Sequence, residues 1–227
     1  MTSEQLQSFI NQLNSKEYTP NIFLHQIANN VDYGDVWELD NKSQKDAYCT
    51  FFIKDNDNYI GAVMRHYKDL HWYLDPNYRS NGHLTSALSK VILPYIFDEL
   101  LAEEQYITID KNLIGNVNYI KSKALALRCG FVQIDDINFK LVASVCESFY
   151  DDSQRVFKGL TKETISSLKD EFCTISKRLK LIESQIDNSY EANIEEYNNF
   201  SLSQMASKIE FLKIVIEDME EDFQTLN

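Results

Sequence analysis

One stretch, residues 71–92, constrains the fold of this chain more than any other. The apolar run 71–74 predicts a strand, and Pro76 ends it because proline cannot donate a ladder hydrogen bond. A polar turn follows, in which Gly82 can adopt a positive φ. From Leu84 the apolar residues recur at helical spacing. A strand therefore leads into a helix through a glycine-containing turn. Its free backbone N–H groups and helix dipole suit a phosphate group, although many such turns bind nothing.

The residues of this turn resemble the pyrophosphate-binding segment of the GNAT superfamily, the acyl-CoA-dependent N-acyltransferases. That segment reads Val-x-Pro-x-Tyr-Arg-Gly-x-Gly-x-Gly/Ala, and here Arg79, Gly82 and Leu84 stand at the Arg-x-x-Gly-x-Gly/Ala positions. Two residues depart from the pattern. Ser80 replaces a common glycine, and Leu84 replaces a small residue, as Met or Leu often does in the branch acting on protein N-terminal amines.

A second segment, residues 122–131, resembles the Ser-x-x-x-x-x-Lys-x-Gly-Phe ending of the same family, with Ser122 first and Gly130-Phe131 last. Gly130 suits the left-handed conformation that closes a helix. Where the family has an asparagine three places before the serine, this chain has Tyr119, with Asn118 one residue earlier. The two motifs occur in the family's order, and the resemblance covers residues 47–142.

The resemblance implies an α+β fold, a mixed and splayed β-sheet flanked by helices, with an acyl-CoA arm between strands 71–74 and 106–109. It implies acetyl-CoA as the acyl donor. Backbone N–H groups of residues 79–84 would hold the pyrophosphate, and one near Tyr73 or Leu74 would face the thioester oxygen. The residues implied to contact acetyl-CoA are Leu74, Arg79, Ser80, Asn81, Gly82, His83, Leu84, Asn118 and Ser122.

Acyl transfer to an amine needs a neutral nucleophile and a proton for the departing thiolate. Many family members have a tyrosine as proton donor where this chain has Ala126, so Tyr119 and Ser122 are the candidate donors. His66 and His71 are candidate bases because histidine titrates near neutrality. Each of these side chains could instead pack or face solvent, and ordered water could replace them.

Three ionisable residues of the turn remain open between binding and structure. Asp75 is a third candidate base. Arg79 suits a phosphate because of its guanidinium group, but it could equally pin the turn. His83 is expected to contact a ligand phosphate or nothing.

The charge balance indicates which partners to expect. The 227 residues include 22 lysines and arginines against 35 aspartates and glutamates, a net charge of −13. This balance disfavours nucleic acid and anionic membranes and attracts a cationic amine or basic peptide. The same charge also serves solubility.

The four cysteines, Cys49, Cys129, Cys146 and Cys173, show neither a C-x-x-C pair nor the spacing of a metal site. Such cysteines are typical of reduced thiols in the cytosol. No apolar run approaches the ~20 residues of a transmembrane helix, and no signal-peptide pattern opens the chain. We therefore expect a cytoplasmic protein without a metal.

The remaining pattern predicts the order of elements in a first domain, residues 1–150. Before the turn we expect a helix over 3–14 with Ser3 as N-cap, a short helix over 21–30, a strand over 36–39, and an antiparallel meander over 48–54, 59–67 and 70–74. Pro94 predicts a helix kink near Leu93. After it we expect a strand over 106–109, a loop over 110–118, a helix ending at Arg128, and strands over 131–134 and 138–143.

Residues 157–227 predict a second domain, an antiparallel helical hairpin that resembles a coiled coil. Apolar residues recur alternately three and four apart, the spacing of an a/d seam. The first seam is Ile165, Leu168, Phe172, Ile175, Leu179, Ile182 and Ile186, and the second is Leu202, Met205, Ile209, Leu212, Ile216, Met219 and Phe223. Thr161 and Ser201 are the expected N-caps. Additional apolar residues, Phe211, Ile214 and Val215, predict packing against the first domain or a second subunit in a homodimer, the alternative being an isolated hairpin.

Two classes of function follow. The first is an N-acetyltransferase that moves an acetyl group from acetyl-CoA to a primary amine of a protein, peptide or small metabolite, by direct attack in a ternary complex. The second is a GNAT-like module of weak or no activity that acts in protein–protein interaction through its C-terminal helices. The turn at Gly82 favours the first, which is the preferred interpretation, whereas Ala126 and Leu84 favour the second.

Overall fold

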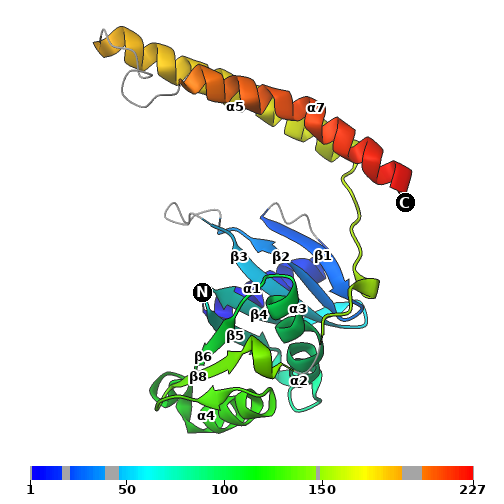
Figure 1. Ribbon diagram of the computed structural model, residues 1–227, viewed down its shortest axis with the longest axis vertical. Helices are drawn as coiled ribbons and strands as arrows, with labels where there is room; N and C mark the ends of the chain where they lie inside the picture. Colours follow the sequence, from blue (N-terminus) through cyan, green and yellow to red (C-terminus); the bar gives the residue numbers. More distant parts are fainter. Residues whose placement is uncertain (1, 17–20, 39–45, 147–148, 191–200, 227) are drawn as a thin grey trace. The chain divides into compact units, whose positions relative to one another are not determined.

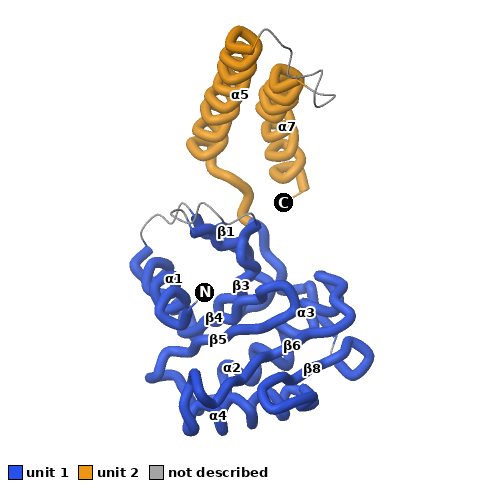
Figure 2. The backbone as a smooth tube through the Cα atoms, turned by 90° about the vertical axis from the view of Figure 1, so that its left-hand side faces the viewer, with its two compact units in different colours: residues 1–157 blue, residues 158–227 orange. Residues whose placement is uncertain are grey.

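The computed structural model describes residues 2–16, 21–38, 46–146, 149–190 and 201–226. The chain divides into two compact units, unit 1 (Met1–Phe157) and unit 2 (Lys158–Asn227), which have different colours in Figure 2. Unit 1 includes residues 151–156, which the sequence assigned to neither domain.

Unit 1 is built on a mixed sheet, in which the described residues form eight strands (Figure 1). Their spatial order is β1 (Ile22–Ala28), β2 (Val31–Val36), β3 (Tyr48–Asp55), β4 (Asn58–His66), β5 (Asp69–Leu74), β6 (Glu104–Thr108), β8 (Asn138–Val142) and β7 (Val132–Gln133). The first five form an antiparallel meander, and β6, β8 and β7 are also antiparallel. The α+β class and the meander over residues 48–74 are confirmed.

The parallel pair at the centre of the sheet separates after its first residues. β4 follows β5 along its whole length, from His66 opposite Asp69 to Gly61 opposite Leu74. Within the described chain, β6 pairs with β5 at a single position, Tyr106 opposite Asp69. Residues 70–74 therefore form an unpaired edge of β5, on the side away from β4. This separation agrees with the splay that the resemblance implied.

Helices cover both faces of the sheet because successive strand residues point to opposite faces. On one face, Phe51 and Val63 join a core that includes residues of α2 (His83–Ala87), α3 (Leu93–Asp98) and α4 (Lys111–Arg128). On the other face, Phe52 and Ala62 pack with α1 (Ser3–Ser15). Strand β5 thus contributes to both cores, through Leu74 on one face and Tyr73 on the other, whereas α2 packs in the first core alone.

The predicted kink at Pro94 takes the form of a π-helical turn. The turn Leu88–Ile92 joins α2 to α3, and Pro94 lies in the first turn of α3. Proline has no N–H to donate, and its ring clashes with the carbonyl four residues earlier in a regular α-helix. The wider π turn accommodates both constraints without ending the helix.

Several predicted elements near the N-terminus were wrong. Residues 21–30 form β1 and a tight turn rather than a helix, and β2 ends at Val36, where a strand was expected to begin. The sequence feature that indicates this hairpin is the pair Asn29-Asn30, which forms the turn between Ala28 of β1 and its partner Val31 of β2. Leu39, the last residue of the predicted strand, lies outside the described residues.

Two helix boundaries also differ from the prediction. The N-cap of α1 is Thr2 rather than Ser3, in a capping box with Gln5. Helix α4 begins at Lys111, within the predicted loop, and Gly115 interrupts it with a φ of 76°. This interruption explains why the periodic pattern is recognisable only after it.

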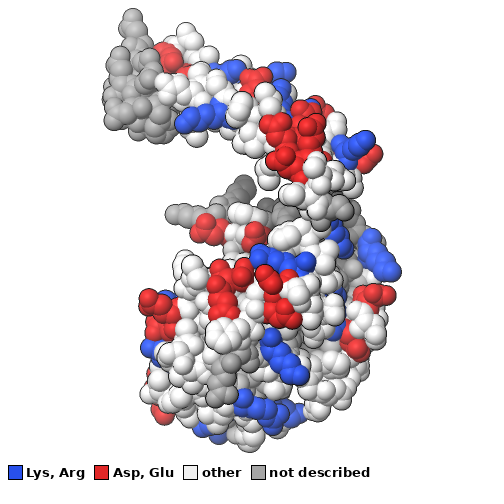
Figure 3. Space-filling view, turned by 45° about the vertical axis from the view of Figure 1, so that its right-hand side comes forward, with Lys and Arg blue, Asp and Glu red and all other residues white. Residues whose placement is uncertain are grey.

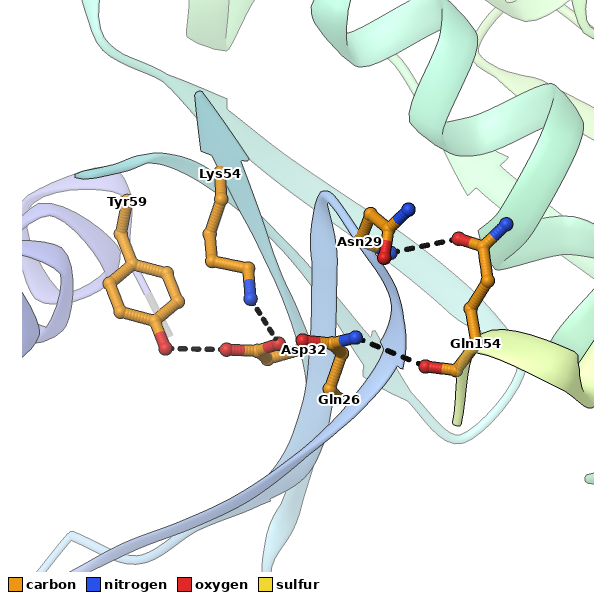
Figure 4. A network of polar contacts seen from close by, with 6 residues as sticks. All are labelled: Gln26, Asn29, Asp32, Lys54, Tyr59 and Gln154. Atoms are coloured by element: carbon orange, nitrogen blue, oxygen red, sulfur yellow. Dashed lines mark hydrogen bonds and ion pairs between the residues drawn. The ribbon is translucent and has the colours of Figure 1, made fainter. Parts of the chain in front are cut away.

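A strap formed by residues 154–157 covers part of the edge strand β1. Gln26 N–H donates to the Val156 carbonyl at 3.2 Å, and Val156 N–H donates back at 2.8 Å. The Gln154 side chain accepts from the Asn29 N–H at 2.9 Å, and its carbonyl accepts from Gln26 Nε2 at 3.1 Å (Figure 4). An open sheet edge is a template for unwanted pairing, so the strap protects this part of the edge.

We expect acid to weaken the attachment of the strap through His25. The His25 ring stacks on Phe157 with the ring centres 4.6 Å apart. Burial, followed by the positive charge of Arg155, lowers the pKa of His25 below its ordinary 6.5, while Asp32 and Asp35 act weakly against this. A lowered pKa in the folded state stabilises the fold above pH 6.5, and that contribution is lost as the pH falls below it.

The measurement is the free energy of unfolding of the wild type and of His25→Phe at pH 7.5 and pH 5.5. Phenylalanine keeps a ring against Phe157 and cannot take up a proton. The wild type should therefore lose more stability on acidification than the variant. An equal loss in both proteins would contradict the role given to His25.

Unit 2 consists of two helices, α5 (Lys162–Tyr190) and α7 (Leu202–Leu226), that pack against each other. They are antiparallel, since Glu183 near the end of α5 contacts the start of α7 at Leu202. Both predicted N-caps are present: Thr161 Oγ1 accepts from Thr164 N–H, and Ser201 Oγ accepts from Gln204 N–H. The predicted polar break, 187–199, lies within α5 up to Tyr190 and beyond that outside the described residues.

Candidate functional site

The turn after β5 is held against the end of that strand. Asp75 caps the short 3₁₀ helix Pro76–Tyr78 by accepting a hydrogen bond from Asn77 N–H at 2.8 Å. Arg79 Nε donates to the Leu74 carbonyl at 2.9 Å. Asp75 thus has a structural contact rather than a free carboxylate. Arg79 pins the turn, as the sequence allowed, and its predicted phosphate contact stays a prediction.

Gly82 opens the helix that follows, with the predicted positive φ of 84°. No side chain caps this helix start. The N–H groups of His83 and Leu84 lie in the first turn, so they have no carbonyl of the helix itself to bond. A Cβ atom at Gly82 would meet nothing within 4 Å, which means that glycine is needed for its φ and that the space above it is open.

The strand register decides which amide of β5 is free. Asp75 N–H donates to the Ile60 carbonyl at 2.9 Å, towards β4. Because backbone groups of successive strand residues point to opposite sides, the Leu74 N–H points away from β4, along the unpaired edge. The Tyr73 N–H points towards β4, opposite Ala62. Of the two amides predicted as the oxyanion donor, Leu74 is therefore the one available to a ligand.

The other turn residues predicted to contact acetyl-CoA are placed as follows. Ser80 and Asn81 are exposed, and Ser80 also has a positive φ of 68°. His83 is half-buried, with its ring centre 6.2 Å from that of Tyr78. The Leu84 side chain is buried in the main core, so only its backbone faces the turn. Leucine can therefore stand at position 84, where the family has a small residue, without its side chain entering the turn.

The candidate proton donors lie on α4. Tyr119 packs partly against the main core, and Lys123 Nζ lies 5.9 Å from the centre of its ring. Ser122 is half-buried three residues later. Asn118 is exposed, and its side-chain amide donates to the Ile114 carbonyl of its own helix. Ala126 is wholly buried, so the position where a tyrosine is common serves packing here.

The candidate histidines do not lie beside the Leu74 amide. His66 stands opposite Asp69, five residues along β5 from Leu74, or about 16 Å at the rise of a strand. His71 is exposed, 3.3 Å from the Asp69 carboxylate, and it points to the face of the sheet opposite Leu74. The structure therefore brings the turn and the Leu74 amide together and leaves both histidines apart from them.

A cluster of charged side chains that the sequence analysis did not predict lies near Asp69 and Tyr106, where β5 and β6 pair. Glu104 bonds Lys140 at 2.5 Å and Lys68 at 2.8 Å, and these contacts, Lys140 first, lower the pKa of Glu104 to about 2. Thr108 N–H donates to the Asp69 carboxylate at 3.0 Å. No sequence motif marks this cluster, because its members come together only through the strand register.

The charged residues of unit 1 form no single field on the face shown in Figure 3, where acidic and basic side chains alternate. In the described parts of the chain, no three histidine, cysteine, aspartate or glutamate side chains are arranged to hold a metal. The four cysteines are free thiols. Of the helices described, none is long and apolar enough to span a membrane.

Comparison with known proteins gives likenesses in structure but none in sequence. No protein-family model and no curated protein matches the chain. Among solved structures, the chain is similar to an acetyltransferase (GNAT family) from Bacillus anthracis, with 12% sequence identity over 46% of this chain and 70% of that one. The TM-score is 0.36. At this similarity, no residue's role is carried over from that protein.

Proposed function

We propose that unit 1 is an N-acetyltransferase, which moves an acetyl group from acetyl-CoA to a primary amine of a protein, peptide or small metabolite. The observation that supports this most is that two backbone binding features meet at the end of one strand. The unpaired edge of β5 ends with the free Leu74 N–H, and the uncapped helix start at Gly82 follows within the same turn. Residues 1–150 would form the acyltransferase domain, with residues 157–227 as an appended helical hairpin.

The two features suit different parts of acetyl-CoA. Of the N–H groups of residues 79–84, that of Arg79 donates to the Pro76 carbonyl, so those of residues 80–84 and the positive end of the helix dipole would hold the pyrophosphate. The pantetheine arm carries amide groups, which can take the place of a neighbouring strand along residues 70–74. The thioester oxygen would then lie near the Leu74 N–H, which stabilises negative charge developing on that oxygen during attack.

The amine would attack the thioester directly while both substrates are bound. The chain's acidic balance raises the local concentration of a cationic amine, which must lose a proton before it attacks. Because His66 and His71 lie apart from Leu74, ordered water is the simplest path for that proton. Tyr119 or Ser122 of α4 is proposed to return a proton to the departing thiolate.

The test is thermal unfolding of the full chain with and without acetyl-CoA. A ligand at a hundred times its Kd stabilises a protein by about 2.7 kcal/mol, which is a shift of several degrees in a chain of this size. We expect that shift in the wild type and its loss in Gly82→Asp, whose carboxylate would occupy the space above the turn and repel the pyrophosphate.

Gly82→Asn is the matched control, since it has the same shape, tolerates a positive φ and has no charge. It should retain more of the shift than Gly82→Asp. No shift in the wild type at millimolar acetyl-CoA would reject the enzyme and favour the second candidate, a GNAT-like interaction module. The buried Ala126, in place of a proton-donating tyrosine, is the observation that keeps this second candidate open.

A further inference from the structure

The two helices of unit 2 bury the seams that the sequence predicted only in part: nine of the fourteen seam residues, Ile165 among them, are buried or half-buried. The residues buried between them include small or polar ones, namely Ser176 (2% exposed), Ala206 (0%) and Glu183 (8%). Five seam residues are instead 40–65% exposed: Ile175, Ile182, Met205, Leu212 and Met219. On each helix the contact line thus keeps at least every second seam residue and moves by one residue at others, to residues 176, 183 and 206. The seam is therefore the intramolecular contact only in part, and the five exposed residues are where the prediction differs from the structure.

Polar contacts fix this contact line. Lys169 pairs with Glu217, and Lys180 Nζ lies 3.7 Å from the Glu210 carboxylate. Glu183 accepts from the Leu202 N–H at 2.8 Å and the Ser203 N–H at 3.1 Å, which satisfies the free amides at the start of α7. Small residues in the contact line allow the helices to approach closely.

The five exposed residues lie together on one side of the helical pair. At about 100° per residue, Ile175 and Ile182 lie roughly 120–160° around α5 from Lys169 and Lys180. On α7, Leu212 lies about 140–160° from Glu210 and Glu217. The ion pairs between these residues place the charged sides of both helices together. The opposite side of the pair is therefore an apolar flank, defined by Ile175, Ile182, Met205, Leu212 and Met219.

We propose that the apolar flank binds the same flank of a second copy of this chain, forming a four-helix bundle. In such a bundle the long apolar side chains of each pair point to the common core, and smaller residues can separate the neighbouring helices. A flank this apolar seldom remains open to water. This inference rests on unit 2 alone and is independent of the proposed acetyltransferase activity.

Charges beside the flank favour a second copy over an unrelated partner. Glu171 and Arg178 are exposed on α5, four residues before and three residues after Ile175, and both lie on the flank's side of the helix. Within the described chain, neither forms an ion pair. A two-fold axis near Ile175 would place Glu171 of each copy opposite Arg178 of the other, and a two-fold interface requires such self-complementarity.

The first experiment measures the mass of the full chain by sedimentation over micromolar concentrations. The wild type should dimerise, and Leu212→Lys should weaken the dimer at least a hundredfold by placing a charge in the bundle core. Ile214→Lys is the matched control: Ile214 is also exposed on α7, but it points away from the flank. It should change the dimer Kd less than threefold. Circular dichroism would establish that both variants keep their helices.

The second experiment exchanges the flanking charges. Glu171→Arg or Arg178→Glu alone would set like charges opposite each other twice in the dimer, and we expect each to weaken it about tenfold. The double variant restores opposite charges only if the partner is a second copy, and its Kd should return to within threefold of the wild type. A monomeric wild type, or a double variant no tighter than the singles, would overturn the proposal in favour of unit 1 or another protein as the flank's partner.

Discussion

Replacing Asp32 with alanine is expected to destabilise unit 1 by about 3–5 kcal/mol, the cost of removing one member of a buried ion pair. The Asp32 side chain accepts hydrogen bonds from Lys54 Nζ at 2.7 Å and from the Tyr59 hydroxyl at 2.5 Å (Figure 4). Lys54 is only 14% exposed, so the substitution would leave an ammonium group without a counter-charge. Burial, and then the bond to Asp32, raise the pKa of Tyr59, so its hydroxyl remains a donor at neutral pH.

The free energy of unfolding in urea measures this effect. Asp32→Asn keeps an oxygen that can accept from Tyr59 or Lys54 but loses the charge, so it should have a smaller effect than Asp32→Ala. Asp35→Ala changes an exposed carboxylate of the same strand and should alter stability by no more than about 0.5 kcal/mol. Equal losses in Asp32→Ala and Asp35→Ala would show that the contacts of Asp32 with Lys54 and Tyr59 add nothing to stability.

The elements around the turn could be predicted because their signals are local. Residues 48–74 alternate β-branched and aromatic residues between short turns, and one of those turns has Asn56 at a φ of 53°. Gly82 and Gly130 adopt the positive φ that their places in the sequence require. In each case a few neighbouring residues determine the backbone, and no distant contact is needed to override them.

The first strand was hard to predict because part of its pairing is with a segment far away in the sequence. β1 lies at the edge of the sheet and lacks a regular apolar alternation, so its residues fit a short helix equally well. Its pairing partners are β2 and the strap around Val156, which is far away in the sequence. Such long-range pairing leaves no signal in the local pattern.

The turn after β5 could be predicted, but the placement of the groups around it could not. The sequence located the turn, and the resemblance implied the Tyr73 or Leu74 N–H as oxyanion donor. The bond from Asp75 to Ile60 shows that, of these two, the Leu74 N–H points away from β4. The histidines were plausible because they lie on the central strands, yet the register places His66 at the far end and His71 on the opposite face. In unit 2, the spacing predicted both helices but not the shift of the contact line to small Ser176 and Ala206.

Replacing Gly34 with alanine should destabilise unit 1 by about 3 kcal/mol, at the upper end of the usual cost of overpacking. An added Cβ would lie 1.9 Å from the Phe23 carbonyl oxygen and 2.9 Å from the Leu24 Cα. Both obstacles are backbone atoms of β1, which cannot rotate away as a side chain can. β1 would have to separate from β2, and its bonds with Val156 of the strap would move with it.

Gly61→Ala is the informative comparison, because its added Cβ would meet the Leu74 Cδ1 at 2.7 Å and the Tyr73 carbonyl oxygen at 2.8 Å. The leucine methyl can rotate away, so the loss of stability should be smaller than in Gly34→Ala. The strain would fall instead on the end of β5, where the Leu74 N–H lies. Urea unfolding should therefore rank Gly34→Ala as the less stable protein, whereas acetyl-CoA should lose more of its stabilising effect in Gly61→Ala. A smaller loss of stability in Gly34→Ala would contradict the rigid contact between β2 and β1. A smaller loss of acetyl-CoA stabilisation in Gly61→Ala would contradict the edge of β5 as the proposed acetyl-CoA site.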